Sequence, residues 1–260
     1  MAGLASFAYA QTRIQSRYGE RADAGVWLKP HNIYDLGSYL QTAQQTALRP
    51  WVLGLSSTHS SHDIELALRQ KYRHHVDEVA SWMPANWQRS LQWIKRLADL
   101  PLLQYLLAGG EPLEWMKSDP DISDFTADDP QQRVQAIREA GNIALVDSWQ
   151  RSGSILPGWL SQWNSMHPKS VYIDQGLKPL EKLLQQQMQL ETTQQGIALP
   201  SDYEIILDRL RLIFRRYAFQ PAAVCAYLVI VAIDLHRVRG DLMQRLFFQA
   251  GQDIEEGLPE

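Results

Sequence analysis

The sequence contains a single cysteine, Cys225, among its 260 residues. It therefore cannot form an internal disulfide or a cluster of cysteine metal ligands. No basic segment followed by a long apolar core stands at the N-terminus, so we expect no signal peptide. The most apolar run, residues 222–233, has no charge, amide or glycine, but it is shorter than the about 20 residues that cross a membrane. We therefore predict a fully buried helix there.

Charge and motif content exclude several further classes of function. The formal net charge of −4 argues against a general nucleic-acid binder. The sequence has no glycine-rich phosphate loop, no dinucleotide-binding fingerprint and no nucleophile elbow. We therefore expect no cofactor. Apolar residues make up 45% of the chain, and a chain of this length can bury a sizeable core without disulfides or metals.

Helical periodicity dominates what the sequence does contain, and the predicted fold class is all-α. The clearest stripe of apolar residues follows Ser60 and Ser61, which are candidate N-caps, with Asp63 in the first turn. A second stripe starts after Pro200. The only strand-like run is residues 170–174. Further helices are predicted at residues 4–17, 33–47, 85–99, 101–108, 131–151, 178–191 and 221–238.

Two polar segments divide the chain. Residues 111–131 carry seven acids against one lysine and contain three prolines. This composition predicts an exposed connection that buries little. Residues 192–201 are polar, with a glycine and a proline, and are predicted to form a loop. The resulting blocks are an N-terminal helical lobe (1–110), a shortened middle helical region with the acidic linker (111–198) and a C-terminal helical lobe (199–260).

Histidines gather in the first third of the chain, which leaves a metal-dependent enzyme as one hypothesis. His59 and His62 stand in the polar stretch around the start of the long predicted helix, and His74 and His75 lie within it. The helical zinc motif of two histidines four residues apart with a glutamate between them is absent. We therefore favour a second interpretation, in which these histidines decorate a loop and a helix surface, and we expect no metal site.

The end of the apolar run carries an acid and a group of arginines. Asp234 could act as a general acid or base if burial shifts its pKa. The favoured alternative is an ion pair with Arg237, with Arg239 or with an arginine of the preceding helix. From Arg209 to Arg245 there are seven arginines against two acids. Such a basic region suits an RNA-binding module or a helical adaptor for an acidic protein face, and we favour a protein partner because no exposed aromatics are interleaved.

A resemblance to a known family rests on both ends of the chain. The segment FAYAQTRIQSRYG, residues 7–19, resembles the opening helix of the AC39-like central-stalk family of V-type and A-type rotary ATPases, with Tyr9 and Arg13 at motif positions. The following IYDLGSYLQTAQQTALRPWVLGL resembles the next helix of that family. Near the C-terminus Tyr227, Asp234 and Arg239 match the last repeat, whereas an arginine at position 237 stands where the family usually has asparagine.

The resemblance implies a role without chemistry of its own. Members of this AC39-like family are funnel-shaped, pseudo-repeated bundles of helical lobes in the central stalk, and they couple the rotor shaft to the membrane rotor ring during ion transport. The implied partners are therefore shaft subunits and the ring, without nucleic acid and without a membrane span. The implied location is the cytoplasmic face of the membrane, as a peripheral part of the complex. The residues that we expect at the partner interface are Arg209, Arg215, Arg216, Arg237 and Arg239.

Overall fold

The computed structural model describes residues 2–30, 32–168, 174–193 and 200–256. Within these ranges every regular element is a helix, so the prediction of an all-α fold is confirmed. The helical elements are α1 (Ala2–Gly19), α2 (Ala24–Leu28), α3 (Leu36–Gln44), α4 (Arg49–Val52), α5 (Ser61–Ser81), α6 (Ala85–Trp93), η1 (Ile94–Ala98), α7 (Leu100–Leu107), α8 (Glu114–Ser118), η2 (Ser123–Phe125), α9 (Pro130–Ile137), η3 (Arg138–Asn142), α10 (Ile143–Ser152), α11 (Leu156–Ser165), α12 (Asp174–Thr193), α13 (Pro200–Arg216) and α14 (Pro221–Glu256).

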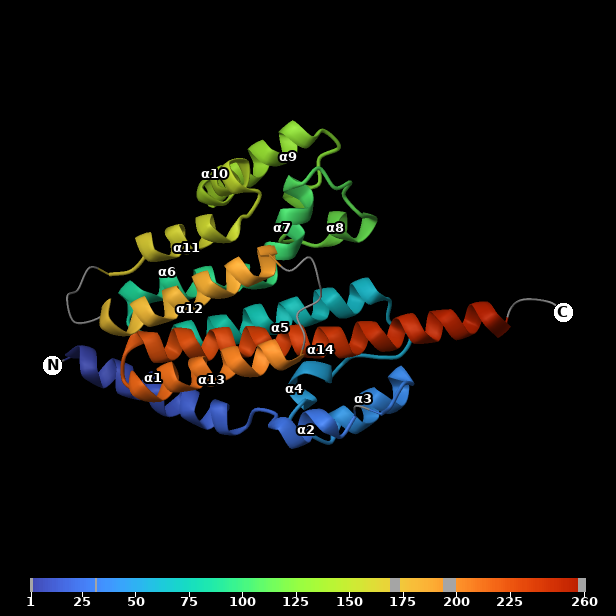
Figure 1. Cartoon of the computed structure of the whole chain (residues 1–260), viewed down its shortest axis with the longest axis horizontal. Helices are drawn as coiled ribbons and strands as arrows, with labels where there is room; N and C mark the ends of the chain where they lie inside the picture. The colour runs from blue at the N-terminus through green and yellow to red at the C-terminus, as the bar shows by residue number, and fades with distance from the viewer. Residues whose placement is uncertain (1, 31, 169–173, 194–199, 257–260) are drawn as a thin grey trace.

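Helix α14 is the longest helix and runs through the middle of the structure, with other helices on both sides of it (Figure 1). It packs against α13, α5, α1 and α12. Helices α1 to α4 lie along one side of α14, and α7 to α11 form a layer on the far side of α5 and α12 (Figure 1). Every residue from Ala222 to Ile233 is buried, so the predicted fully buried helix is confirmed. An apolar helix needs cover on all sides, and this arrangement supplies it.

Helix α14 continues 18 residues beyond the predicted end at position 238, to Glu256. Contacts with distant segments stabilise the extension. Arg239 pairs with Glu65 of α5, and the buried Arg245 donates hydrogen bonds to the carbonyl oxygens of Ile33, at 2.7 Å, and Pro30, at 2.8 Å. By length and composition alone, Pro221–Phe248 would suffice to cross a membrane, but 89% of its most apolar window is buried within the protein.

Helix α5 begins where the sequence predicts it. The Ser60 hydroxyl accepts a hydrogen bond from the Asp63 backbone N–H at 3.2 Å, and the Asp63 carboxylate accepts one from the Ser60 N–H at 3.0 Å. This reciprocal pair satisfies two backbone donors that a helix start leaves open. The predicted apolar face of α5 is buried, including Ile64, Tyr72 and Val79.

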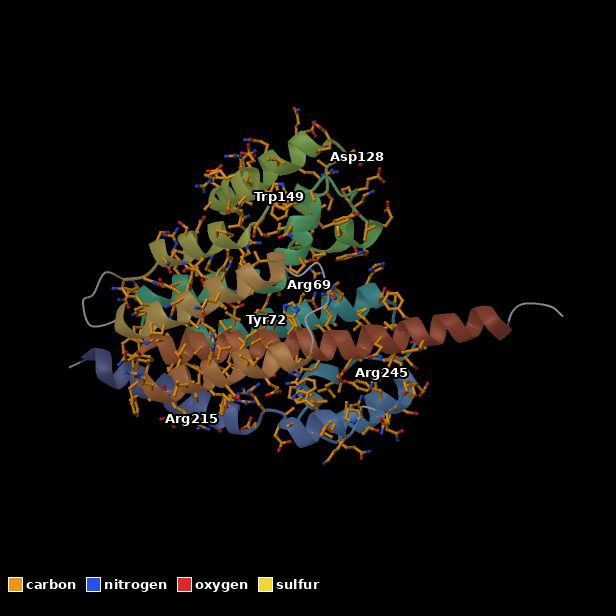
Figure 2. The ribbon with its side chains drawn as sticks, in the orientation of Figure 1. Arg69, Tyr72, Asp128, Trp149, Arg215 and Arg245 are labelled. Carbon is orange, nitrogen blue, oxygen red and sulfur yellow. The ribbon has the colours of Figure 1, made fainter. Side chains whose placement is uncertain are left out.

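The acidic segment 111–131 is largely exposed, as its composition predicts, but four of its residues are buried. Met116, Ile122 and Phe125 are buried in it, and Asp119 is 0% exposed. The Asp119 carboxylate lies 2.6 Å from the guanidinium of Arg69, which is also buried and projects from α5. Figure 2 shows Arg69 inside the molecule, beside the layer to which this segment belongs. Burial of charge is tolerated because each ion has a partner of opposite sign.

The middle region differs from its prediction in two places. The predicted helix 131–151 is divided into α9, the short π-helical turn η3 and α10, with Gly141 in the left-handed region at φ 84°. Helix α11 was not predicted. It crosses α10 so closely that a Cβ on Gly158 would lie 2.0 Å from the carbonyl oxygen of Ala144, so only glycine fits there. The strand-like residues 170–173 lie outside the described residues.

Candidate partner-binding surface

Helix α13 has one face in the core and one face exposed. Ile206, Leu207, Leu210, Ile213 and Phe214 are buried, because the helix packs between α14 and α12. The start at Pro200 agrees with the predicted start signal. The buried residues recur at the three- and four-residue steps of a helix face, so the opposite face must point outward.

The exposed face of α13 carries apolar residues that are not among the predicted interface residues. Ile205 is 57% exposed and Leu212 is 63% exposed. With Arg209 and Arg216 they stand at positions i, i+4, i+7 and i+11, which form one continuous stripe along a helix. We call this stripe, together with Arg215, the outer face of α13. Its two apolar residues could have been found from the same periodicity, since they lie opposite the buried stripe.

The structure separates the five arginines that were expected at a partner interface. Arg209, Arg215 and Arg216 are exposed on α13, and Arg209 donates only to the Gln186 side chain, at 3.2 Å, among the contacts that the structure describes. Figure 2 shows Arg215 near the outer edge of the molecule. The other two have acidic partners within the chain. Arg237 pairs with Glu204 at 3.0 Å, and Arg239 pairs with Glu65.

The turn after α13 presents an exposed aromatic ring on a strained backbone. Phe219 is 49% exposed, and its φ of 65° is unusual for a bulky residue. Its backbone N–H donates to the side-chain oxygen of Gln11 at 3.0 Å, and Gln11 is buried on α1. The buried Gln11 amide therefore holds a costly backbone conformation in the turn that follows α13, where a phenylalanine side chain is half exposed. Strained positions of this kind are frequent at functional sites.

The motif positions of the two ends lie in neighbouring helices. Tyr9 and Arg13 are exposed on α1, where Arg13 donates to the Tyr9 hydroxyl at 2.9 Å. The Arg13 guanidinium also lies 4.8 Å from the ring centre of Trp82, a cation–π contact. Helix α1 packs on α14, which carries Tyr227 and Asp234. Segments more than 200 residues apart in the sequence are therefore adjacent in the fold.

Asp234 is a buried ion-pair residue, but its partner is not among those expected. The carboxylate accepts two hydrogen bonds from Arg21, at 2.6 and 2.7 Å. Arg21 follows α1, whereas the sequence pattern favoured Arg237, Arg239 or the preceding helix. Burial raises the pKa of Asp234 and the Arg21 guanidinium opposes this. A bidentate pair satisfies the charge of both groups, so the structure favours a packing role over general acid–base chemistry.

The four histidines of the first third are dispersed. His59 accepts a hydrogen bond from the Ser56 N–H at 3.3 Å, and the His62 ring stacks on Trp115 with centres 5.1 Å apart. His74 is exposed. The Nε2 atom of His75 lies 2.9 Å from the Tyr227 hydroxyl. Within the described part of the chain, no group of three or more histidine, cysteine, aspartate or glutamate side chains is placed to hold a metal ion.

His75 is expected to make the stability of the protein sensitive to acid. Burial lowers its pKa to about 4 from an ordinary value of 6.5. Between these values the unfolded state binds the proton and the folded state does not, so the folded state loses stability as the pH falls. The unsubstituted protein should lose more stability than His75→Gln when the pH falls from about 7 to about 4.5. We expect the two losses to differ by on the order of 2 kcal/mol. Urea unfolding at both pH values measures them.

The adjacent His74 provides the control for this measurement. It is on the same helix but exposed, so His74→Gln should retain the loss of stability that the buried His75 causes on acidification. If His75→Gln and the unsubstituted protein lose the same stability on acidification, His75 does not carry the effect.

Comparisons with known proteins supply no family for this chain. No family model matches it, and neither the curated proteins nor the solved structures yield a match.

Proposed function

We propose that this chain is a non-catalytic central-stalk subunit of a V/A-type rotary ATPase, which couples the rotor shaft to the membrane rotor ring. In this proposal it resides at the cytoplasmic face of the membrane through the complex. The outer face of α13 binds a shaft helix that carries apolar and acidic residues.

The observation that carries this proposal is the composition of the outer face of α13. Two large apolar side chains, Ile205 and Leu212, are more than half exposed on a helix whose other face is fully packed. Three arginines accompany them, and the described residues contain no acidic partner for Arg215 or Arg216. An apolar stripe between arginines is complementary to an amphipathic acidic helix, since arginine forms bidentate pairs with carboxylates.

The position of the resembling segments supports the same proposal. The N-terminal and C-terminal segments that resemble the AC39-like family pack on one another. The buried Arg21–Asp234 pair joins them. Close packing of helices from the N-terminal and C-terminal blocks gives this part of the protein the stiffness that torque transmission requires.

A buried Asp-Leu pair occurs in two segments of the chain, and this repetition supports the proposal of structurally related lobes. Asp99 and Asp234 each precede a leucine in the two segments RLADLPLLQYL and VAIDLHRVRGDL. Both carboxylates are buried. Arg73 pairs with Asp99, as Arg21 pairs with Asp234. Each acid thus ties its segment to an arginine from another part of the chain: Arg73 of α5 for Asp99, and Arg21, which follows α1, for Asp234.

The test is recovery of the partners by a chain with an altered outer face. The tagged chain is purified from its own cells, and co-purifying proteins are identified by mass spectrometry. We expect shaft and ring subunits of a rotary ATPase with the unsubstituted chain, and about tenfold less of them with Leu212→Asp, because a carboxylate would replace apolar contact and face acidic residues.

Leu28→Asp is the matched control, because Leu28 is 69% exposed on α2 and lies outside the outer face of α13. It should recover the partners as the unsubstituted chain does. Absence of every rotary ATPase component from the unsubstituted preparation would refute the proposed function. Equal recovery by Leu212→Asp and Leu28→Asp would refute the proposed surface.

A further inference from the structure

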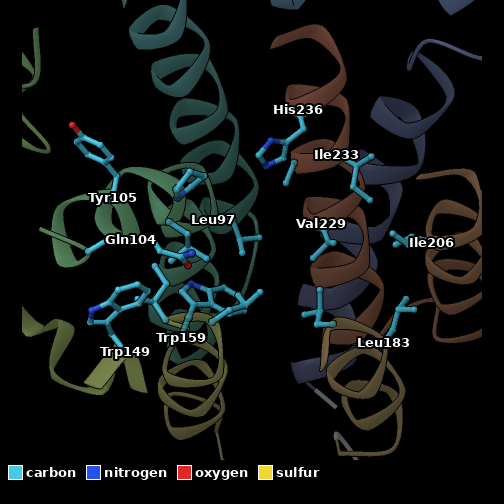
Figure 3. Close-up of a pocket in the computed structure, with 17 residues that line it drawn as sticks. Leu97, Gln104, Tyr105, Trp149, Trp159, Leu183, Ile206, Val229, Ile233 and His236 are labelled. Atoms are coloured by element: carbon cyan, nitrogen blue, oxygen red, sulfur yellow. The ribbon is translucent and has the colours of Figure 1, made fainter. Parts of the chain in front are cut away.

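A cavity of about 650 Å³, open to solvent on one side, lies between the layer of α7, α10 and α11 and the helices α12, α13 and α14. Its walls come from η1, from α7, α10 and α11 on one side, and from α12, α13 and α14 on the other. Figure 3 shows the two walls facing each other, with Trp149 and Trp159 opposite Leu183 and Val229. The volume falls in the range of small-molecule sites, about 300–1,000 Å³.

The lining of this cavity is apolar and carries no formal charge. Among the lining residues that the structure describes there is no lysine, arginine, aspartate or glutamate. The polar side chains in the wall are Gln104, Tyr105 and His236. Tyr105 already donates its hydroxyl to the carbonyl oxygen of Glu111 at 2.9 Å. An ionised ligand would lose its hydration here without an opposite charge, so the chemistry of the wall selects a neutral molecule.

An unpaired hydrogen-bond donor in the wall points to the polar part of that molecule. Trp159 is 1% exposed, and its indole N–H has no hydrogen-bond partner within the described chain. The neighbouring Trp93, by contrast, donates its indole N–H to the Trp159 carbonyl at 3.2 Å. A buried donor without an acceptor costs free energy, and a ligand that supplies an oxygen atom recovers it.

Two polar side chains that can donate or accept hydrogen bonds lie near the Trp159 indole N–H, Gln104 on the same wall and His236 on the opposite wall. Figure 3 shows Gln104 pointing toward Trp159, and His236 reaching into the cavity from α14. Gln104 is exposed on α7, so rotation of its side chain would open the indole N–H to a ligand. Burial lowers the pKa of His236, and the neutral imidazole offers one donor and one acceptor nitrogen.

We propose that this cavity binds a neutral single-chain lipid, whose hydrocarbon chain lies between the two walls and whose uncharged carbonyl or hydroxyl oxygen accepts the Trp159 indole N–H. Gln104 and His236 supply further hydrogen bonds to the same head group. The inference does not depend on the proposed coupling function, because no residue that lines the cavity belongs to the outer face of α13. Ile206, which does line it, lies on the opposite, buried side of that helix.

Calorimetric titration with 1-monolauroylglycerol, below its micelle concentration, tests the proposal. The comparison ligands are laurate, which carries a carboxylate, and dodecane, which has no head group. We expect saturable one-to-one binding of 1-monolauroylglycerol, and binding weaker by about tenfold or more for both comparison ligands. Laurate binding as tightly as the neutral lipid would overturn the proposed selectivity, and heat only above the micelle concentration would overturn the site.

Two variants locate the binding in the cavity. Ala108 is exposed at the mouth of the cavity, so Ala108→Trp should block entry and weaken binding about tenfold or more without disturbing the core. Ala85→Trp is the matched control, because Ala85 is equally an exposed alanine but lies outside the cavity. Trp159→Phe keeps an aromatic side chain, though a smaller one, and removes the donor, and it should reduce the preference for the glyceride over dodecane. Equal affinity in Ala108→Trp and Ala85→Trp would overturn the proposal.

Discussion

Replacing Asp234 with alanine is expected to lower the free energy of unfolding by about 3–5 kcal/mol. The Asp234 side chain is 5% exposed and that of Arg21 is 12% exposed. Removal of the carboxylate would leave the guanidinium without the two short hydrogen bonds that compensate for its lost hydration. Urea unfolding at neutral pH measures the loss.

A double variant separates the ion pair from simple packing. In Arg21→Met with Asp234→Leu both charges are removed and apolar volume is retained, so most of the stability should return. The single variant Asp234→Ala should therefore be less stable than the double variant. If instead Asp234→Ala costs less than about 1 kcal/mol, the pair does not organise the contact between α1 and α14.

Replacing Asp119 with alanine is expected to have an effect of similar size, about 3–5 kcal/mol. Asp119 is 0% exposed, and Arg69 is 1% exposed beside it. The guanidinium of Arg69 lies 2.6 Å from Asp119, whereas its next acids, Glu65 and Asp99, are 3.9 and 4.0 Å away. Its geometry with Asp119 is that of a charge contact rather than a linear hydrogen bond, since the nitrogen atoms of Arg69 have no hydrogen-bond partner among the described residues. Charge compensation at this site thus depends chiefly on Asp119.

Asp124 offers the control for this prediction within the same acidic segment. It is exposed, so Asp124→Ala should change the free energy of unfolding by no more than about 0.5 kcal/mol. Asp119→Asn preserves the side-chain oxygen that accepts the Asp121 N–H at 3.0 Å, and it removes the charge by replacing the oxygen that faces Arg69 with an NH₂ group. If Asp119→Asn is as stable as the unsubstituted protein, the buried charge on Asp119 is not required.

The acidic segment 111–131 shows that average composition does not reveal which individual residues are buried. An average over residues 111–131 describes seven acids against one lysine and predicts solvent exposure. The fold instead uses one of these acids to compensate Arg69, an arginine on the buried face of α5. Sequence periodicity places Arg69 one position after Leu68, but it does not reveal which segment covers it.

The candidate partner surface was partly predictable. The basic character of Arg209, Arg215 and Arg216 is visible in the sequence, and the exposure of Ile205 and Leu212 follows from the helical period once the buried stripe is assigned. The internal pairing of Arg237 and Arg239 with Glu204 and Glu65 was not predictable, because these partners come from other helices. No residue near Phe219 in the sequence predicts its positive φ, because the hydrogen bond that holds this conformation comes from Gln11 of α1.

The sequence by itself determined the helical class, the start of α5 at Ser60 and the burial of residues 222–233. These features depend on capping and periodicity, which act within one or two turns of chain. Only the tertiary structure decided that Arg21 is the partner of Asp234, that Asp119 of the acidic segment is buried against Arg69, and that α14 extends past position 238. These outcomes depend on contacts between residues far apart in the chain, and such contacts exist only once the helices have packed.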